Sequence, residues 1–281
     1  MIKHKIIIFV LIVLSFSSCI TTKTAVKDFN NAEYYDASIK FEKIIKEGDS
    51  ENSFLLAESL RKSNRLWQAE KYYKDAIKFG IRDEMAYYYL TLSLKGNSNY
   101  NAADSLISNY LSKGKDEAVI NLMRRESLHI KNLRLYPDTS YYKVKNLKAL
   151  NTNYAEYSPA FSNEKLYFVS NRQSEKIYSG TGTPFTDLYE IKSKGANVDI
   201  NSLKKLGENI NNEKVNEGSI TFSGDGMYMI FAKGNNGKSN GRNNVDLYYS
   251  RYRRSGWANP RLLNVNTSRS WDSTPFLTKD G

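Results

Sequence analysis

The single cysteine of the 281-residue sequence, Cys19, lies where a covalent modification could take place. It follows a positively charged start with Lys3 and Lys5, nine apolar residues at positions 6–14, and a mostly small-residue stretch at positions 15–18. Nine apolar residues are too few to cross a hydrocarbon core of about 30 Å, which needs about 20. They suit the apolar part of a cleaved export signal, so the sequence predicts such a signal ending at Cys19.

The residues up to Cys19 resemble a lipoprotein lipobox, with Phe16 at the position where leucine is usual. The resemblance implies that residues 1–18 are a signal peptide and that Cys19 becomes the lipid-bearing first residue of the mature protein. An acylated Cys19 would leave no thiol for a disulfide or for catalysis. The alternatives are an ordinary signal peptide with an incidental cysteine, or a short anchor helix.

Other residues whose types could carry out chemistry favour structural interpretations. Residues 232–239 match a relaxed phosphate-loop string, but the glycine- and asparagine-rich continuation cannot open the helix that such a loop needs. His129, the one histidine after the signal, has no partner carboxylate or serine cluster nearby in the sequence. Asp187 and Asp246 occupy equivalent places in repeated units, which favours a structural role. No cysteine–histidine–carboxylate group has zinc spacing. The sequence therefore predicts no enzyme, no cofactor and no metal.

The net charge of +11 is spread along the chain. It falls to about +9 once Lys3 and Lys5 leave with the signal, and no dense basic stripe remains of the kind that nucleic-acid binding requires. Nucleic acid is therefore not an expected partner.

The elements that would position these residues differ between two regions. From residue 24 to about 135, proline is absent and apolar residues recur every three or four positions, which predicts helices. Small residues at Ala37, Ala69 and Ala103 are spaced by 32 and 34 residues, which is typical of helix–turn–helix repeats. The first copy is expected to lack half of its length, because its opening helix would start almost at Cys19. Residues 115–134 are predicted to form a helix that covers the last repeat.

This helical region resembles tetratricopeptide repeats. The resemblance implies that the first helices of the second and third copies line a groove for a peptide or protein segment. The predicted groove residues are Phe54, Glu58, Arg61, Lys62, Tyr88, Leu92 and Lys95. The alternatives are an unrelated helical bundle and, for each residue, packing on a neighbouring repeat.

From about Tyr141 the sequence has short aromatic and β-branched runs separated by turn residues, which predicts an all-β region. Units of strand, tight turn, strand, loop and Asp-Leu-Tyr strand repeat, with Phe161, Phe222 and Phe276 spaced by 61 and 54 residues. This order is typical of a propeller blade. Two units and part of a third cannot close a ring, so a fragment or a shortened gene product is expected, the alternative being an open stack of two sheets.

These units resemble the WD-repeat-like propellers of the TolB kind. The order of parts resembles Bacteroidota outer-membrane lipoproteins in which an OmpA-like, peptidoglycan-binding domain follows. The resemblance implies an α+β multidomain fold. Its parts would be a signal peptide at 1–18, tetratricopeptide-like helices at 19–135, a linker at 136–152 and the start of a β-propeller at 153–281.

The same resemblance implies a non-enzymatic scaffold at the periplasmic face of the outer membrane, in a secretion or envelope-integrity assembly. Its partners would be the membrane, through lipidated Cys19, and envelope proteins. Peptidoglycan would be reached indirectly or through a domain missing here. The alternatives are a propeller-gated hydrolase whose catalytic domain lies beyond residue 281, and a surface glycan-binding lipoprotein.

Overall fold

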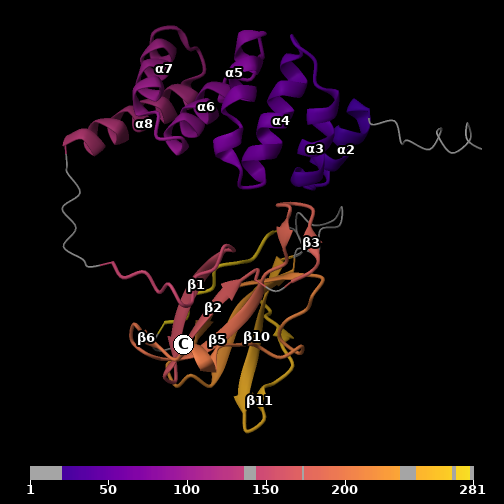
Figure 1. The fold of residues 1–281 in the computed structure, drawn as a ribbon, viewed down its shortest axis with the longest axis vertical. Helices are drawn as coiled ribbons and strands as arrows, with labels where there is room; N and C mark the ends of the chain where they lie inside the picture. Colours follow the sequence, from indigo (N-terminus) through magenta and orange to yellow (C-terminus); the bar gives the residue numbers. More distant parts are fainter. Residues whose placement is uncertain (1–20, 136–143, 173, 235–244, 268–269, 279–281) are drawn as a thin grey trace, which may run out of the picture.

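A computed structural model describes residues 21–135, 144–172, 174–234, 245–267 and 270–278. Along the chain, α-helices are followed by antiparallel β-sheets, so the α+β order predicted from the sequence is confirmed (Figure 1). Cys19 and most of the phosphate-loop-like string at 232–239 lie outside the described residues. Of the helices within these described ranges, none is long and apolar enough to cross a membrane.

The helices form three consecutive pairs and a final longer helix. Their bounds are α2 (Thr22–Asn30), α3 (Tyr34–Ile44), α4 (Ser50–Lys62), the 3-10 turn η2 (Leu66–Gln68), α5 (Glu70–Lys78), α6 (Met85–Gly96), α7 (Tyr100–Lys113) and α8 (Glu117–Leu135). The expectation that the first pair would be half missing is wrong, because α2 supplies its opening helix. The hydroxyl of Thr21 accepts a hydrogen bond from the Thr24 amide and caps α2, which allows a helix of only nine residues to start directly there.

The turn inside each helix pair repeats with the period of the sequence. Ala32, Asn64 and Ser98 have positive φ angles of 62°, 61° and 58°, a conformation uncommon for residues other than glycine. Each lies five positions before one of the small residues at 37, 69 and 103, which are fully buried in the helical core. The residue with the positive φ ends one helix, and the small alanine side chain lets the next helix pack closely against it.

The β region contains two sheets of the same design. The first is built from β1 (Glu156–Ser162), β2 (Lys165–Ser170), β5 (Asp187–Lys194), β6 (Asn197–Val198) and β7 (Lys204–Lys205). The second is built from β8 (Asn216–Phe222), β9 (Tyr228–Gly234), β10 (Val245–Arg253), β11 (Gly256–Trp257) and β12 (Arg261–Leu262). The order β1-β2-β5 in one sheet corresponds to β8-β9-β10 in the other, and each third strand carries a short strand on its outer edge.

The strands predicted for the first two units are present, but the opening strand expected around Phe276 is not formed in the described residues 270–278. The run at 165–170 is β2, and the runs at 227–232 and 246–250 lie mostly in β9 and within β10. The predicted tight turn at Asp225-Gly226 joins β8 to β9, and Gly226 has the positive φ of 67° that such a turn requires. Each first strand has an irregularity at the same place, marked by a positive φ at Ser158 and at Ser219, 61 residues apart.

Apolar side chains between the two sheets form one core, which includes Val169, Leu188, Met229 and Phe231. The opposite face of the first sheet is covered by Leu147 and Leu150, which belong to the segment expected to be a linker.

A short hairpin, β3 (Ile177–Tyr178) and β4 (Thr183–Pro184), extends from the first sheet to the helices (Figure 1). The Tyr35 amide at the start of α3 donates a hydrogen bond to the Ser179 carbonyl at 3.0 Å. The ring of Tyr35 lies over Gly182, where a Cβ atom would be only 2.1 Å from it. The hairpin therefore connects the sheets to the first helix pair through a close backbone contact.

Candidate functional site

The predicted groove residues lie on α4 and α6, the opening helices of the second and third pairs. At the centre of this surface, Glu58 is buried, pairs with Lys62 at 3.9 Å and binds two further neighbours. The Tyr73 hydroxyl donates to Glu58 Oε1 at 2.5 Å. The Arg61 guanidinium donates to both carboxylate oxygens, at 2.8 and 2.6 Å. This forked geometry fixes the orientation of the arginine.

Arg61 also contacts the next helix pair. Its guanidinium carbon lies 3.8 Å from the centre of the Tyr89 ring, a cation–π contact between α4 and α6. Burial alone would lower the pKa of Arg61, but the hydrogen bond and the negative charge of Glu58 raise it above its usual range. Burial and the Glu58 charge likewise raise the pKa of Tyr73. The cluster therefore holds the guanidinium at a fixed place, with its charge balanced by the Glu58 carboxylate.

The other predicted cations are held by neighbouring helices. The Lys62 ammonium lies 4.8 Å from the Phe29 ring centre and 5.2 Å from that of Tyr34, so it reaches the first helix pair. Lys95 forms an ion pair with the buried Glu126 of α8. These lysines therefore also connect the pairs to one another, as expected if groove residues pack on neighbouring repeats.

The remaining predicted residues, Phe54, Tyr88 and Leu92, are partly buried and retain exposed surface. The structure thus brings Phe54, Glu58 and Arg61 together and places Tyr88 beside Tyr89, with ring centres 5.4 Å apart. Together with Lys62 and Lys95, these seven predicted residues are called the helical face below. It offers partly exposed apolar and aromatic groups beside fixed cations.

The sequence analysis missed the aromatic partners of these cations. Tyr73 and Tyr89 complete the Arg61 cluster, and Phe29 contacts Lys62 from a helix that was not expected. The run Tyr87-Tyr88-Tyr89 was the available signal, because three consecutive aromatic residues on one helix cannot all face the core.

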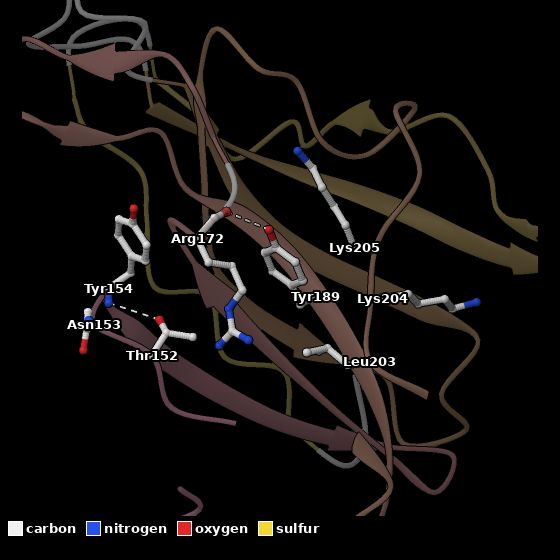
Figure 2. A pocket seen from close by; sticks show the side chains of 8 residues that line it. All are labelled: Thr152, Asn153, Tyr154, Arg172, Tyr189, Leu203, Lys204 and Lys205. Atoms are coloured by element: carbon white, nitrogen blue, oxygen red, sulfur yellow. Dashed lines mark hydrogen bonds between the residues drawn. The ribbon is translucent and has the colours of Figure 1, made fainter. Parts of the chain in front are cut away.

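A second polar region lies on the outer side of the first sheet. Figure 2 shows a pocket of about 440 Å³, lined by Thr152, Asn153, Tyr154, Arg172, Tyr189, Leu203, Lys204 and Lys205. The cations that line it have carboxylate partners: Arg172 pairs with Glu156 at 2.9 Å, Lys204 with Glu190 at 3.0 Å, and Lys205 with Asp187 at 2.7 Å. Because these charges are already paired, the pocket is not a ready anion site.

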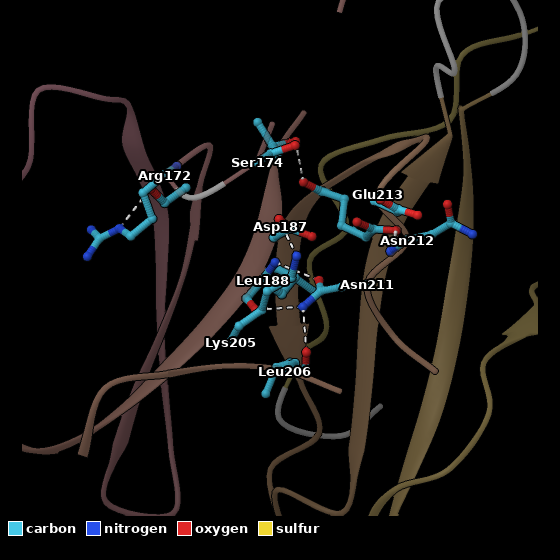
Figure 3. Close-up of polar contacts among 12 residues, drawn as sticks. Arg172, Ser174, Asp187, Leu188, Lys205, Leu206, Asn211, Asn212 and Glu213 are labelled. Atoms are coloured by element: carbon cyan, nitrogen blue, oxygen red, sulfur yellow. Dashed lines mark hydrogen bonds and ion pairs between the residues drawn. The ribbon is translucent and has the colours of Figure 1, made fainter. Parts of the chain in front are cut away.

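The loop between the two sheets contains an asparagine that replaces a strand partner (Figure 3). Asn211 accepts from the Leu188 amide at 2.8 Å and donates to the carbonyls of Leu188 at 3.0 Å and Leu206 at 2.8 Å. In the second sheet, Asn266 makes the same three contacts, with Leu247 at 2.7 and 2.8 Å and with Leu263 at 2.9 Å. We call Asn211 and Asn266 the seam asparagines, because each lies where one unit passes into the next.

An acidic residue completes each seam. The Asn212 amide donates to Glu217 at 3.1 Å, and the Thr267 amide donates to Asp272 at 2.8 Å. Glu217 is fully buried and pairs with Lys233 at 3.0 Å. Burial raises its pKa to about 8, against the opposing effect of the lysine charge. Burial also raises the pKa of Asp187 and of Asp246, the two residues for which a structural role was expected.

Other candidates do not assemble into a site. His129 is half exposed on α8 and has Glu126, three residues earlier, at 3.6 Å, so the expectation that no carboxylate lies near it is wrong. Across the described ranges there is no group of three or more His, Cys, Asp or Glu side chains that could hold a metal ion. Cys19, the predicted lipid site, lies outside these ranges. A scan against protein-family models gives no match, and a search of curated proteins finds none that is significantly similar.

Proposed function

We propose that the protein is a non-enzymatic scaffold of the bacterial envelope, tied to the outer membrane by a lipid on Cys19, whose helical face binds a segment of a partner protein. Three helix pairs with equivalent turns support a tetratricopeptide-like array. Two sheets with equivalent seams support propeller-like units. The proposal includes a periplasmic orientation and a place among Bacteroidota lipoproteins that reach peptidoglycan indirectly or through another domain.

The observation that carries the proposal is the arrangement of the helical face. Arg61 is fixed by Glu58 and Tyr89, so little side-chain entropy remains to be lost when a partner segment packs against it. Tyr88 and Leu92 lie on α6, the opening helix of the next pair, where they can contact apolar side chains of the same segment. A partner segment with alternating apolar and polar residues would match this surface.

Site-specific photo-crosslinking in cells tests the helical face. A photoreactive residue at Leu92 should capture one defined envelope protein, and Lys62→Glu should weaken that capture, because it reverses a charge on the face. The matched control carries the same photoreactive residue at Leu111, which is also partly exposed but lies on α7, the second helix of its pair. Equal capture from both positions would contradict the proposed face.

The anchor is tested separately by labelling with a fatty-acid probe. The full chain should take up the label and sediment with the outer membrane, and Cys19→Ala should do neither. An unlabelled wild-type chain would refute the anchor and leave the helical face to be judged by the crosslinking result.

A further inference from the structure

The segment before the first strand has the same local structure as the loop that joins the two sheets. In the joining loop, the amides of Ile210 and Asn211 donate to the Gly207 carbonyl at 2.9 and 3.0 Å. Before the first strand, the amides of Leu150 and Asn151 donate to the Leu147 carbonyl at 2.8 and 3.0 Å. The two turns therefore match position by position, 60 residues apart.

The contacts of a basic side chain with each turn match as well. In the joining loop, Lys233 donates to the Ile210 carbonyl at 2.6 Å and pairs with Glu217. Before the first strand, Arg172 donates to the Leu150 carbonyl at 2.7 Å and pairs with Glu156 at 2.9 Å.

The hydrogen bond from a backbone amide to the acidic side chain is also the same at the two places. The Thr152 amide donates to Glu156 at 3.1 Å, as the Asn212 amide does to Glu217. Residues 147–156 thus repeat the turn, the basic contact and the acidic contact that surround Asn211. Such a turn, which binds a strand of the preceding sheet, is called a receiving turn.

The difference lies in what the asparagine binds. Asn211 is buried and binds the backbone of Leu188 through both its amide and its carbonyl. Asn151, at the equivalent position, is exposed, and its side chain donates to Asn146 at 2.9 Å. In the segment that precedes this turn, Val144 is 93% exposed and is equivalent to Lys204 of the paired edge strand β7. Within the described ranges, no strand is paired with residues 144–146.

We propose that residues 144–156 form a preformed docking site for an extended strand of the Asp-Leu-Tyr type, whose leucine backbone binds Asn151. The occupant follows from the two seams. Both seam asparagines bind a leucine that is preceded by aspartate and followed by tyrosine, in β5 and in β10. These two strands are already bound by Asn211 and Asn266, so the occupant is a further strand of that sequence.

This mode of binding uses main-chain hydrogen bonds for affinity and side-chain pockets for selectivity. The strand adds to the exposed edge at Val144. Its leucine faces Leu150, as Leu188 shares a core with Ile210, and its tyrosine points to the opposite face. The proposal does not depend on the helical face, because it uses different residues.

A peptide that copies residues 184–191, Pro-Phe-Thr-Asp-Leu-Tyr-Glu-Ile, tests the docking site in trans. It is titrated into the full-length, nitrogen-15-labelled chain while the side-chain amide signal of Asn151 is followed. We expect saturable binding with a dissociation constant of about 1 mM or below. Asn151→Ala should weaken it about tenfold, which corresponds to the loss of two hydrogen bonds.

Two controls make the result specific. A peptide with an N-methylated leucine cannot donate to Asn151 and should bind about as weakly as the wild-type peptide binds the alanine variant. Asn146→Ala removes the present partner of the Asn151 side chain and should preserve or strengthen binding. The proposal is overturned if the peptide does not saturate the chain, or if Asn151→Ala or N-methylation leaves the affinity unchanged.

Discussion

Replacing Asn211 by alanine should destabilise the sheets far more than the same change at Asn266 or at Asn151. Asn211 is 3% exposed and makes three side-chain hydrogen bonds. At a net 0.5–1.5 kcal/mol for each bond, their loss costs about 1.5–4.5 kcal/mol. The Leu188 carbonyl keeps a second donor, the Leu206 amide at 2.9 Å, but its own amide is left without this partner in a fully buried position. We expect a loss of about 3 kcal/mol in the free energy of unfolding.

The other two asparagines serve as matched comparisons. Asn266 makes the equivalent bonds but is only partly buried, so water can replace part of what is lost, and about 1 kcal/mol is expected. Asn151 is exposed and has one side-chain partner, so its replacement should change the stability by less than about 0.5 kcal/mol.

The measurement is urea-induced unfolding followed by tryptophan fluorescence. Replacing Trp67 by phenylalanine removes the tryptophan of the helical region, so that Trp257 and Trp271 report on the sheets alone. Equal losses for Asn211 and Asn266 would refute the argument from burial. A loss at Asn151 as large as that at Asn211 would refute the view that its strand partner is missing from the described fold.

Three further changes test other parts of the structure. Because burial raises the pKa of Glu217 from 4.5 to about 8, the folded state holds this proton more tightly, so its contribution to stability is present below pH 4.5 and is lost as the pH rises towards 8. At 1.36 kcal/mol per pKa unit, the free energy of unfolding should decline by about 3–5 kcal/mol over that range. Glu217→Gln should abolish this decline, as measured by urea unfolding at several pH values, and an unchanged slope would contradict the expectation. Arg61→Lys keeps the charge but loses the forked carboxylate contact and the ring contact, so the helices should lose about 1–2 kcal/mol, measured by far-ultraviolet circular dichroism. Gly182→Ala places a Cβ on the Tyr35 ring at a positive φ and should speed hydrogen exchange of the Tyr35 amide, whereas Gly195→Ala, at a positive φ in open space, should not.

The periodic parts of the fold could be predicted from the sequence because they rest on local patterns. The small residues Ala37, Ala69 and Ala103 marked the helix pairs, and β2 begins and ends where its aromatic run does. The region from residue 24 was predicted to be helical, but α2 was not recognised as a separate opening helix. A nine-residue helix has too few turns to show a clear apolar period, and its cap at Thr21 decides where it begins.

The functional surfaces were less accessible to sequence reasoning because their contacts join distant positions. Arg61 contacts Tyr89 of the neighbouring helix pair, and nothing in the spacing selects that tyrosine among three consecutive ones. The seam asparagines were hidden for another reason. Asn211 follows Leu206 by five residues, while Asn266 follows Leu263 by three, so the two loops do not align as a repeat.

The seams also determine how such a region could change in length. Each asparagine precedes the first strand of its own unit in the sequence, but in space it completes the sheet before it. A stretch from residue 147 to residue 206 therefore contains one receiving turn and one strand that is received by the following turn. Duplicating or deleting such a stretch would leave every turn that follows a sheet with a strand of the right sequence. Sheets could then be gained or lost as whole units without any new contact having to arise at their boundaries.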